Sequence, residues 1–367
     1  MDYEDASDIY RRSIKPNLFR LDPEFAHDLA HKGIPVLKQL VTMGLIRSYQ
    51  PPARLVCRLF ERELAGPVGL AAGFDKNGAL LDTVDALGFS FVEVGSITAR
   101  PSIGNPRPRL FRLPGDEAVI NFMGLNGLGA DVVAARLLAA KPSLPYGVNI
   151  AKTNDPSLTG DKAVEDILFS FRAIRNLNAA YVAVNVSCPN TQEEIAAMGK
   201  ELATVLSEIA KLNERSLPIL IKLSPDADDR LLQELLSVSG EGGVKGFICG
   251  NTSMDRSALV NSKDELASIN RGGMSGRPLK RRALDLVRRV YALKESNQII
   301  IACGGISSGD DAFEFIQEGA DLLQIYTSLI YQGPFAASII NCRLSEILEQ
   351  HGLTLEELPG SRVKIAG

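Results

Sequence analysis

Short apolar runs recur eight times from residue 67 onward, and stretches with a helical period separate most of them. The runs are nearly continuous in Val, Ile, Leu and Ala, as expected for parallel strands that are buried on both faces. Strands that alternate with helices indicate βαβ units, and eight such units in about 300 residues predict a closed barrel. The predicted strands cover residues 67–73, 89–98, 146–151, 181–185, 218–223, 245–252, 298–306 and 322–330.

The main competing fold is an open, doubly wound sheet that binds a dinucleotide. No GxGxxG motif follows any of the eight runs, so the fingerprint of that fold is absent. The α/β class with a (β/α)8 TIM barrel is therefore favoured. Helices are expected between the strands at residues 163–178, 193–213, 226–239, 281–295 and 308–318.

The first 55 residues precede the barrel and have a helical pattern of their own. The segment Asp22-Pro23-Glu24 reads as an N-cap, a proline at the first helical position and an acidic second residue. An apolar face follows at residues 25–30, and a second apolar stretch, 34–46, begins after Gly33. We expect a small N-terminal extension of two short amphipathic helices, residues 1–55, before a catalytic barrel domain, residues 56–367.

The composition excludes several classes of protein. Charged residues make up 23% of the chain and hydrophobic ones 45%, and the net charge of −4 comes with no basic stripe, so nucleic-acid binding is not favoured. The five cysteines are odd in number and never spaced as CxxC, which argues against disulfides or a zinc cluster. The three histidines lie near the chain ends, so we expect no metal. No run approaches the roughly 18 apolar residues of a membrane span.

Polar residues gather where six of the predicted strands end, which is the rim where barrel active sites are built. The long insertion 99–126 follows the second strand, and loops of this length are usually functional. Glycine-rich residues 303–309 end the seventh strand and residues 324–328 end the eighth. Because barrel phosphate sites lie after these two strands, a mononucleotide or a sugar phosphate is expected there.

Two kinds of side chain at the rim point to chemistry. Lys76 and Lys222 lie at strand ends, where each must meet an anion or an electron-rich group, or act as a Schiff base; the residues alone leave both uses open. Five asparagines suit a ligand with amide edges, such as a pyrimidine or an isoalloxazine, although any single one could simply form a turn. They are Asn121, Asn149, Asn185, Asn190 and Asn251.

Cys188 differs from the other cysteines, which we interpret as core residues, because it follows a strand end and precedes Pro189. Its thiol could be a nucleophile or a base. No histidine is placed to activate it, which disfavours a Cys–His dyad.

Five blocks of sequence resemble the dihydroorotate dehydrogenase family, and the resemblance runs over nearly the whole chain. The blocks are 69–78 (GLAAGFDKNG), 104–113 (GNPRPRLFRL), 185–191 (NVSCPNT), 272–279 (GGMSGRPL) and 323–327 (LQIYT). The resemblance implies oxidation of dihydroorotate to orotate in pyrimidine biosynthesis, with FMN as the hydride acceptor and Cys188 as the base that takes a proton from C5.

The resemblance also implies roles for individual residues. The cofactor-binding residues would be Ala71, Ala72, Gly73, Ser96, Asn149, Asn185, Lys222, Ser275, Gly276, Gly305, Tyr326 and Thr327. The substrate-binding residues would be Lys76, Asn121, Phe122, Met123, Gly124, Leu125, Asn185, Asn190, Asn251 and Thr252. A quinone tunnel would involve His27, Arg112 and Tyr326.

The family divides by electron acceptor, and this chain carries marks of both branches. Soluble members use fumarate or an NAD-linked partner and typically have Cys as the base, whereas members that reduce quinone have an N-terminal helical pair and typically have Ser. We weigh the extension above the single Cys188 and expect the quinone-linked branch. That branch implies ubiquinone or menaquinone as acceptor and peripheral association with the bacterial cytoplasmic membrane or the mitochondrial inner membrane.

Two positions depart from the family pattern. Phe122 stands where the quinone-linked members usually have Arg, and Gly250 replaces a usual Thr. Two other functions were weighed: a flavin-free barrel isomerase or lyase that acts on a sugar phosphate through Lys222, and a non-enzymatic scaffold that uses the apolar N-terminal helices.

Overall fold

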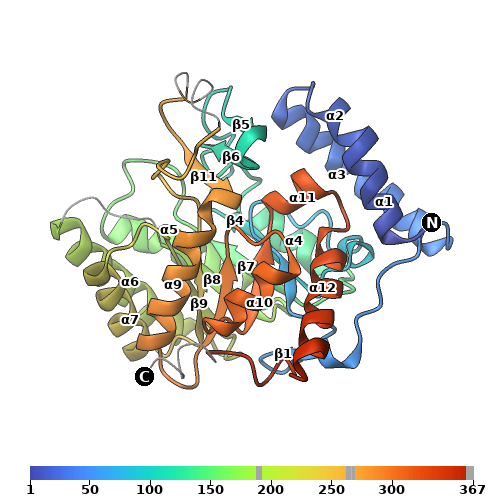
Figure 1. The fold of residues 1–367 in the computed structure, drawn as a ribbon. Helices are drawn as coiled ribbons and strands as arrows, with labels where there is room; N and C mark the ends of the chain where they lie inside the picture. Colours follow the sequence, from blue (N-terminus) through green and yellow to red (C-terminus); the bar gives the residue numbers. More distant parts are fainter. Residues whose placement is uncertain (187–191, 262–265, 267–268, 361–367) are drawn as a thin grey trace.

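A closed barrel of eight parallel strands lies at the centre of the computed structural model, which describes residues 1–186, 192–261, 266 and 269–360 (Figure 1). The order around the barrel is β10-β12-β13-β3-β4-β7-β8-β9. Each predicted run contains one of these strands, so the (β/α)8 expectation is confirmed. The strands are β3 (Val68–Leu70), β4 (Phe91–Ile97), β7 (Tyr146–Ile150), β8 (Tyr181–Asn185), β9 (Ile219–Leu223), β10 (Gly246–Cys249), β12 (Ile299–Cys303) and β13 (Leu322–Ile325).

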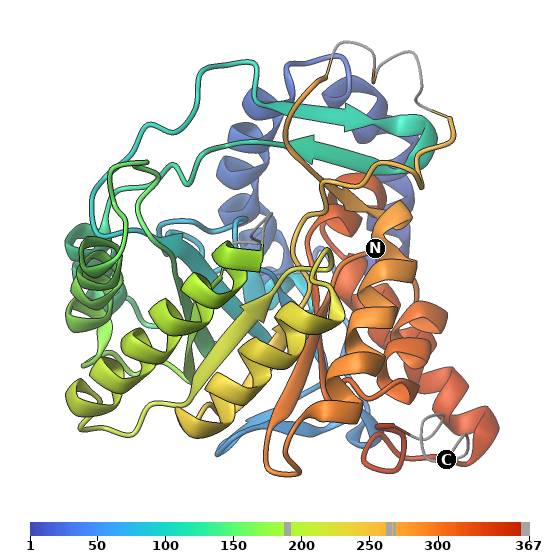
Figure 2. The same ribbon diagram turned by 90° about the vertical axis from the view of Figure 1, so that its left-hand side faces the viewer.

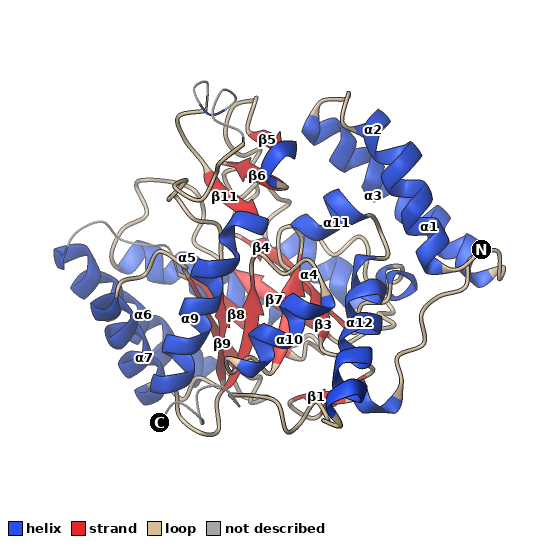
Figure 3. Cartoon of the chain, viewed as in Figure 1, coloured by secondary structure: helices blue, strands red, loops and turns tan. Residues whose placement is uncertain are grey.

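Helices surround the barrel on the outside (Figure 3). The α-helices after the second strand are α4 (Ala130–Ala139), α5 (Asp161–Ile174), α6 (Gln192–Leu212), α7 (Asp229–Glu241), α9 (Lys280–Leu293), α10 (Gly309–Gln317), α11 (Thr327–Gln332) and α12 (Ala336–His351). Short 3-10 turns are η2 (Ala53–Leu55), η3 (Val84–Leu87), η4 (Pro114–Asp116) and η5 (Arg277–Leu279). The apolar strand faces pack on these helices in one large core.

Bulky rings fill the barrel interior, and two glycines make room for them. Phe91 and Tyr181 are fully buried there. A Cβ at Gly69 would lie 2.4 Å from the ring of Phe91, and one at Gly147 would lie 2.1 Å from the ring of Tyr181. Such spacing leaves no space for a side chain, so the barrel packs as a filled core rather than a pore. The antiparallel hairpin β1 (Cys57–Leu59) and β2 (Arg62–Leu64) adds Leu59 and Leu64 to this interior cluster.

The insertion 99–126, which follows β4, contains more regular structure than the sequence suggested. It forms the antiparallel hairpin β5 (Leu110–Leu113) and β6 (Ala118–Asn121), and β11 (Gly273–Gly276) adds a third strand beside β6. Figure 2 shows this small sheet and the N-terminal helices at the same end of the barrel. A pairing partner 150 residues away in the chain gives no local signal, so the third strand was not predicted.

The N-terminal extension is helical, but not as two short helices. Residues 3–18 form α1 (Tyr3–Ile9), a π-helical turn η1 (Tyr10–Ile14) and α2 (Lys15–Leu18), and α3 runs from Pro23 to Thr42. The predicted break at Gly33 is therefore wrong, and the helix also continues through Pro35. Glycine and proline cost about 1 and 3 kcal/mol inside a helix, but buried Ala26 and Ile34 pack α3 against the protein. Tertiary packing outweighs the local preference.

Glu24 and the Arg107–Arg109 segment fasten α3 to the insertion. Arg109 donates to both carboxylate oxygens of Glu24, at 3.2 Å from Nε and 2.6 Å from Nη2, and Arg107 donates to Oε1 at 3.0 Å. These hydrogen bonds, the one from Arg109 first, hold the pKa of Glu24 below its usual value. Among the helices of the described residues, none is long and apolar enough to cross a membrane.

Candidate active site

A cavity of about 390 Å³ opens at the carboxyl ends of the barrel strands, beneath the β5–β6 hairpin and beside α3. It is lined by all of the predicted cofactor-binding residues except Asn149, which lies fully buried. All of the predicted substrate-binding residues line it as well, except Asn190, which lies outside the described residues. Cys188 also lies outside them. Of the predicted tunnel residues, His27 and Tyr326 line the cavity and Arg112 does not.

Glu93 on β4 forms the polar centre below this cavity and is fully buried. Its Oε1 accepts hydrogen bonds from Asn149 Nδ2 at 2.9 Å and from Lys222 Nζ at 3.2 Å. Its Oε2 accepts from Tyr181 OH at 2.7 Å and from Gln324 Nε2 at 2.9 Å. The Lys222 ammonium is thus neutralised by a carboxylate, which does not favour its use as a Schiff-base amine.

Glu93 was not among the predicted site residues. A single Glu inside the apolar run Phe91–Ile97 was the available signal, because an acidic residue within a strand buried on both faces requires a partner. Cys303 was interpreted as a core residue; it packs partly against the barrel core but also lines the cavity.

A chain of amide side chains leads from Glu93 to the rim. Asn149 Oδ1 accepts from Ser96 Oγ, and Ser96 Oγ accepts from Asn185 Nδ2 at 3.2 Å. Asn185 Oδ1 accepts from Asn251 Nδ2 at 3.2 Å, and Asn251 Oδ1 accepts from the backbone N–H of Thr252 at 2.9 Å. Three of the five predicted asparagines therefore form one hydrogen-bonded row, which places several donors and acceptors around the cavity.

Glycines bring the main chain close to the cavity after β12 and β11. Gly305 has φ +74°, and a Cβ there would lie 2.3 Å from the backbone nitrogen of Lys280. Gly276 has φ +100°, and its Cβ would lie 2.3 Å from the carbonyl oxygen of Glu117. Both backbone conformation and space therefore require glycine. Glycine-rich main chain at a cavity wall is also a feature of phosphate-binding loops.

Lys76 lies in the turn after β3, which Asp75 stabilises by accepting from the N–H groups of Ala79 and Leu80, both at 2.8 Å. No described residue forms a hydrogen bond or an ion pair with the Lys76 ammonium. Burial lowers its pKa, and the charge of Glu24 partly offsets that effect. An ammonium that is partly buried at a cavity wall, without a partner among the described residues, is suited to bind an anion.

Four rings connect α3 to the cavity. The ring centroids of His27 and His31 are 4.5 Å apart, those of His31 and Phe74 4.8 Å, and those of Phe74 and Tyr326 5.6 Å. Burial lowers the pKa of His27 to about 3, and the charges of His31 and Lys76 act in the same direction. The His27 imidazole is therefore neutral at physiological pH.

Arg112 on β5 contacts the N-terminal helices instead of the cavity. Its guanidinium donates to the carbonyl oxygens of Leu18 at 2.9 Å, Phe19 at 3.4 Å and Leu21, and it lies 4.7 Å from the centre of the Phe19 ring. It therefore satisfies carbonyl groups at the end of α2 that have no partner within the helix. Its role in a quinone tunnel stays a prediction.

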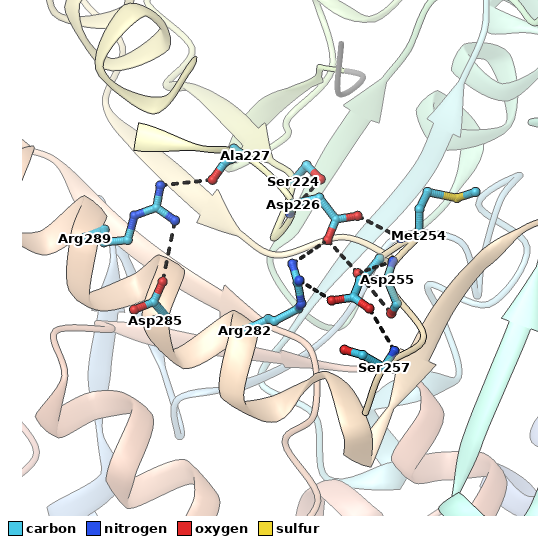
Figure 4. Close-up of polar contacts among 10 residues, drawn as sticks. Ser224, Asp226, Ala227, Met254, Asp255, Ser257, Arg282, Asp285 and Arg289 are labelled. Carbon is cyan, nitrogen blue, oxygen red and sulfur yellow. Dashed lines mark hydrogen bonds and ion pairs between the residues drawn. The ribbon is translucent and has the colours of Figure 1, made fainter. Parts of the chain in front are cut away.

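An ionic clamp holds the loops after β9 and β10 to α9 (Figure 4). Arg282 Nη1 donates to Asp226 Oδ1 at 3.0 Å, and Nη2 donates to Asp255 Oδ2. Asp226 Oδ2 accepts from the N–H of Met254 at 2.7 Å. The loop that is held in this way begins with Asn251 and Thr252, both at the cavity wall. The clamp therefore fixes the backbone on which these two side chains stand.

The two departures from the family pattern have local explanations. The guanidinium of Arg271 lies 4.3 Å from the centre of the Phe122 ring, so a cation stands beside this position although the side chain is aromatic. Gly250 has φ +137°, and a Cβ there would lie 1.6 Å from the carbonyl oxygen of Cys303. The backbone thus requires glycine at position 250, and the absence of a hydroxyl follows from that.

The family model for dihydroorotate dehydrogenase matches residues 54–348, which is most of the chain. This chain belongs to the dihydroorotate dehydrogenase family. Members of this family depend on a flavin, and the described parts of all five matching blocks contribute residues to the cavity wall.

Similar proteins place the chain within the family. It is 41% identical over 368 residues to the dihydroorotate dehydrogenase (quinone) of Roseiflexus sp., covering 95% of this chain and 98% of the relative. It is 38% identical to that of Gloeobacter violaceus, covering 94% and 96%. A crystal structure of the Eimeria tenella enzyme in complex with ferulenol has a TM-score of 0.79 at 33% identity and covers 93% of this chain and 96% of that one.

The relatives support the quinone-linked dihydroorotate dehydrogenase branch, as the N-terminal extension predicted, and do not favour the fumarate- or NAD-linked alternative. Cys188 therefore stands in a chain whose relatives belong to the branch that typically has Ser. Within the described residues, no group of three His, Cys, Asp or Glu side chains could hold a metal ion.

Proposed function

We propose that this chain oxidises dihydroorotate to orotate with bound FMN and passes the electrons to ubiquinone or menaquinone. One observation carries the proposal: a single cavity combines a row of neutral amides, a paired Lys222 and an unpaired Lys76. A planar ring with amide edges satisfies the row, and a carboxylate satisfies Lys76. Dihydroorotate and the flavin ring together have these groups.

The cavity has the features that FMN needs. Gln324 is fully buried, its Oε1 has no hydrogen-bond partner among the described residues, and it lines the cavity. Gly276 and Gly305, whose positions have no room for a side chain, line the cavity where the ribityl phosphate would lie. Lys222, Asn185 and Ser96 would face the ring, and Ser275, Tyr326 and Thr327 the phosphate side. When bound, FMN supplies a two-electron acceptor for the substrate hydride.

The substrate would lie against the flavin, with Lys76 and the rim amides around it. Lys76 would bind its carboxylate, while Asn121, Asn251 and Thr252 would hold the amide groups of its ring. The Cys188 thiolate would remove the proton at C5. Holding the base and the hydride acceptor on opposite faces of one ring is a positioning task, which a rigid barrel rim suits.

The extension, residues 1–55, would form the quinone-binding unit and lie on the membrane surface. Its helix α3 exposes Phe25, Leu29 and Val36, with exposed fractions of 58%, 45% and 57%, and Met43 just beyond it is 73% exposed. Amphipathic helices of this kind lie in the membrane interface. A neutral His27, which lines the cavity as Tyr326 does, can hydrogen-bond to an uncharged quinone carbonyl without bringing a charge into an apolar passage.

The purified full chain tests the proposal. We expect visible flavin absorption, and dihydroorotate turnover that is fast with a short-chain ubiquinone and slow with fumarate or NAD. A colourless protein would overturn the FMN assignment and favour the flavin-free isomerase or lyase. Equal turnover with fumarate would overturn the quinone assignment alone. Binding to anionic lipid vesicles that is lost in a Phe25→Glu, Val36→Glu variant tests the membrane surface.

A Cys188→Ser variant tests the base. A thiol has a pKa of about 8.5, far below that of an alcohol. We therefore expect flavin reduction by dihydroorotate to reach its plateau at lower pH in the native protein than in the variant, and to be slower in the variant. Identical pH profiles in stopped-flow measurements would contradict a direct role for the thiol.

A further inference from the structure

Glu93 is unusual because it is a fully buried carboxylate whose four hydrogen-bonding positions are all occupied. The donors come from four strands: Asn149 of β7, Tyr181 of β8, Lys222 of β9 and Gln324 of β13. A carboxylate has about four lone-pair sites, so Glu93 is saturated. It is also the partner in the one ion pair of Lys222 that the described residues form, which makes the pair electrically neutral.

The carboxylate fixes the direction of the whole amide row. Glu93 only accepts, so Asn149 must present its NH₂ group to it and its Oδ1 to Ser96. The Ser96 hydroxyl is then used as a donor toward Asn149 and must accept from Asn185. Asn185 in turn offers Oδ1 to Asn251. Reversing one amide would break the bond on each side of it, so the pattern of donors and acceptors facing the cavity follows from Glu93.

We infer that Glu93 is a positioning residue for the redox site: it holds Lys222 as a charged but neutralised donor toward the cofactor, and it sets the orientation of the Asn149–Ser96–Asn185–Asn251 row. The redox consequence of this inference rests on the proposed function with bound FMN. The ion pair itself can be tested without the flavin.

The groups around Lys222 show why the charge of its ammonium depends on Glu93. From β4, β8 and β12 the titratable neighbours are Glu93, Tyr181 and Cys303, while Asn149 and Gln324 are uncharged. Burial raises the pKa of both Tyr181 and Cys303, which leaves them neutral. Burial is the largest single influence and lowers the pKa of Lys222, but the charge of Glu93, the influence of Cys303 and the hydrogen bond to Glu93 together outweigh it, so the net shift is upward. Without Glu93, only the smaller influence of Cys303 opposes burial, so we expect the pKa of Lys222 to be lowered.

The reduction potential of the bound flavin tests the redox consequence in the holoenzyme. In Glu93→Gln, Lys222 is an uncompensated cation at low pH and favours the reduced flavin. We expect at least a tenfold change in the ratio of affinities for reduced and oxidised flavin, a positive shift of about 30 mV for a two-electron couple. The shift should disappear as pH rises and Lys222 loses its proton. The double variant Glu93→Gln, Lys222→Met should lack this pH-dependent step.

Glu318→Gln is the matched control. Glu318 is also buried, but it pairs with Arg288 at 2.9 Å on the outside of the barrel. Its loss removes a buried carboxylate from an ion pair without touching the cavity, so the potential of the flavin should equal that of the native protein. A potential that is the same in Glu93→Gln and Glu318→Gln at every pH would overturn the redox part of the inference.

Thermal unfolding of the flavin-free protein tests the ion pair independently. In the native protein the folded-state pKa of Lys222 is raised, so its stabilisation is present at neutral pH. In Glu93→Gln the folded pKa lies below the unfolded value, and stability then rises with pH between the two. The melting temperature of Glu93→Gln should therefore lie below that of the native protein at pH 7, and the difference should shrink toward pH 10. The difference in melting temperature between Glu318→Gln and the native protein should not change with pH, because Arg288 keeps its charge.

The two experiments separate the possible failures. If the melting temperature of Glu93→Gln lies below that of the native protein by the same amount from pH 7 to pH 10, Glu93 does not hold the charge of Lys222, whether or not the protein binds flavin. A colourless native protein would instead overturn the proposed function and leave the unfolding result to decide the ion pair.

Discussion

At the scale of single residues, the two rim lysines have different environments although the sequence treats them alike. Lys222 is almost fully buried against Glu93, while Lys76 has no partner among the described residues. The first is a neutralised donor below the cavity, and the second is a cation that needs an anion from outside. We therefore expect the substrate carboxylate at Lys76 and the flavin at Lys222.

A Lys76→Met variant tests this division. A hydrogen bond to a charged group contributes about 1.5–3 kcal/mol, so we expect orotate to bind about ten to a hundred times more weakly, as measured by titrating the flavin spectrum. Flavin content should not change. Loss of flavin together with unchanged orotate affinity would show that Lys76 belongs to the cofactor site.

At the scale of elements, two arginines of α9, Arg282 and Arg289, have different binding partners (Figure 4). Arg282 holds the loop that starts at Asn251, whereas Arg289 donates to the Ala227 carbonyl at 2.9 Å and pairs with Asp229 and Asp285. Of the two, only Arg282 contacts the loop after β10 directly, through Asp255, so we expect it to have the larger effect on Asn251 and Thr252.

We expect Arg282→Met to raise KM for dihydroorotate about five- to tenfold, because the loop loses hydrogen bonds to a charged group, and to change kcat less. Arg282→Lys should restore part of the affinity. The matched Arg289→Met variant should lower the melting temperature without changing KM. A KM that responds equally to both substitutions would mean that general loosening of α9 is responsible.

The contact of α3 with the barrel makes stability depend on pH through His27. Its folded pKa is about 3 against an ordinary 6.5, so below pH 6.5 the unfolded chain binds more protons and the free energy of unfolding falls. At pH 5 the loss is about 2 kcal/mol, since one pKa unit corresponds to 1.36 kcal/mol. His27→Gln lacks this loss, so between pH 8 and pH 5 its free energy of unfolding in urea should fall by about this amount less than that of the native protein. Parallel curves would contradict a buried neutral imidazole.

The elements differ in how far the sequence could predict them. The barrel strands were predictable because a strand buried on both faces must be apolar along its whole length, as in Ile219–Leu223. The rim residues followed, since the fold fixes where strand ends meet. The continuous α3 was not predictable from Gly33 and Pro35, because packing outweighs propensity there. Glu93 was missed because its partners come from four strands distant in sequence, and only the closed barrel brings them together.

At the scale of the whole molecule, the β5–β6 hairpin and the N-terminal helices lie at one end of the barrel (Figure 2), and residues of both line the cavity. The Glu24–Arg109 pair and the Arg112 contacts join the extension to this end. In the proposed function, the substrate and the quinone would approach one flavin from different sides. The extension should therefore matter for reoxidation of the flavin and not for its reduction.

The most direct test is anaerobic double-mixing stopped flow, in which dihydroorotate is mixed first and a short-chain ubiquinone second. We predict that dihydroorotate bleaches the flavin both in the full chain and in a protein lacking residues 1–55, and that the quinone restores the colour rapidly only in the full chain. Bleaching by the shortened protein also shows that its barrel is folded. Failure of dihydroorotate to bleach the flavin of the full chain, or equally rapid reoxidation of both proteins, would contradict the account.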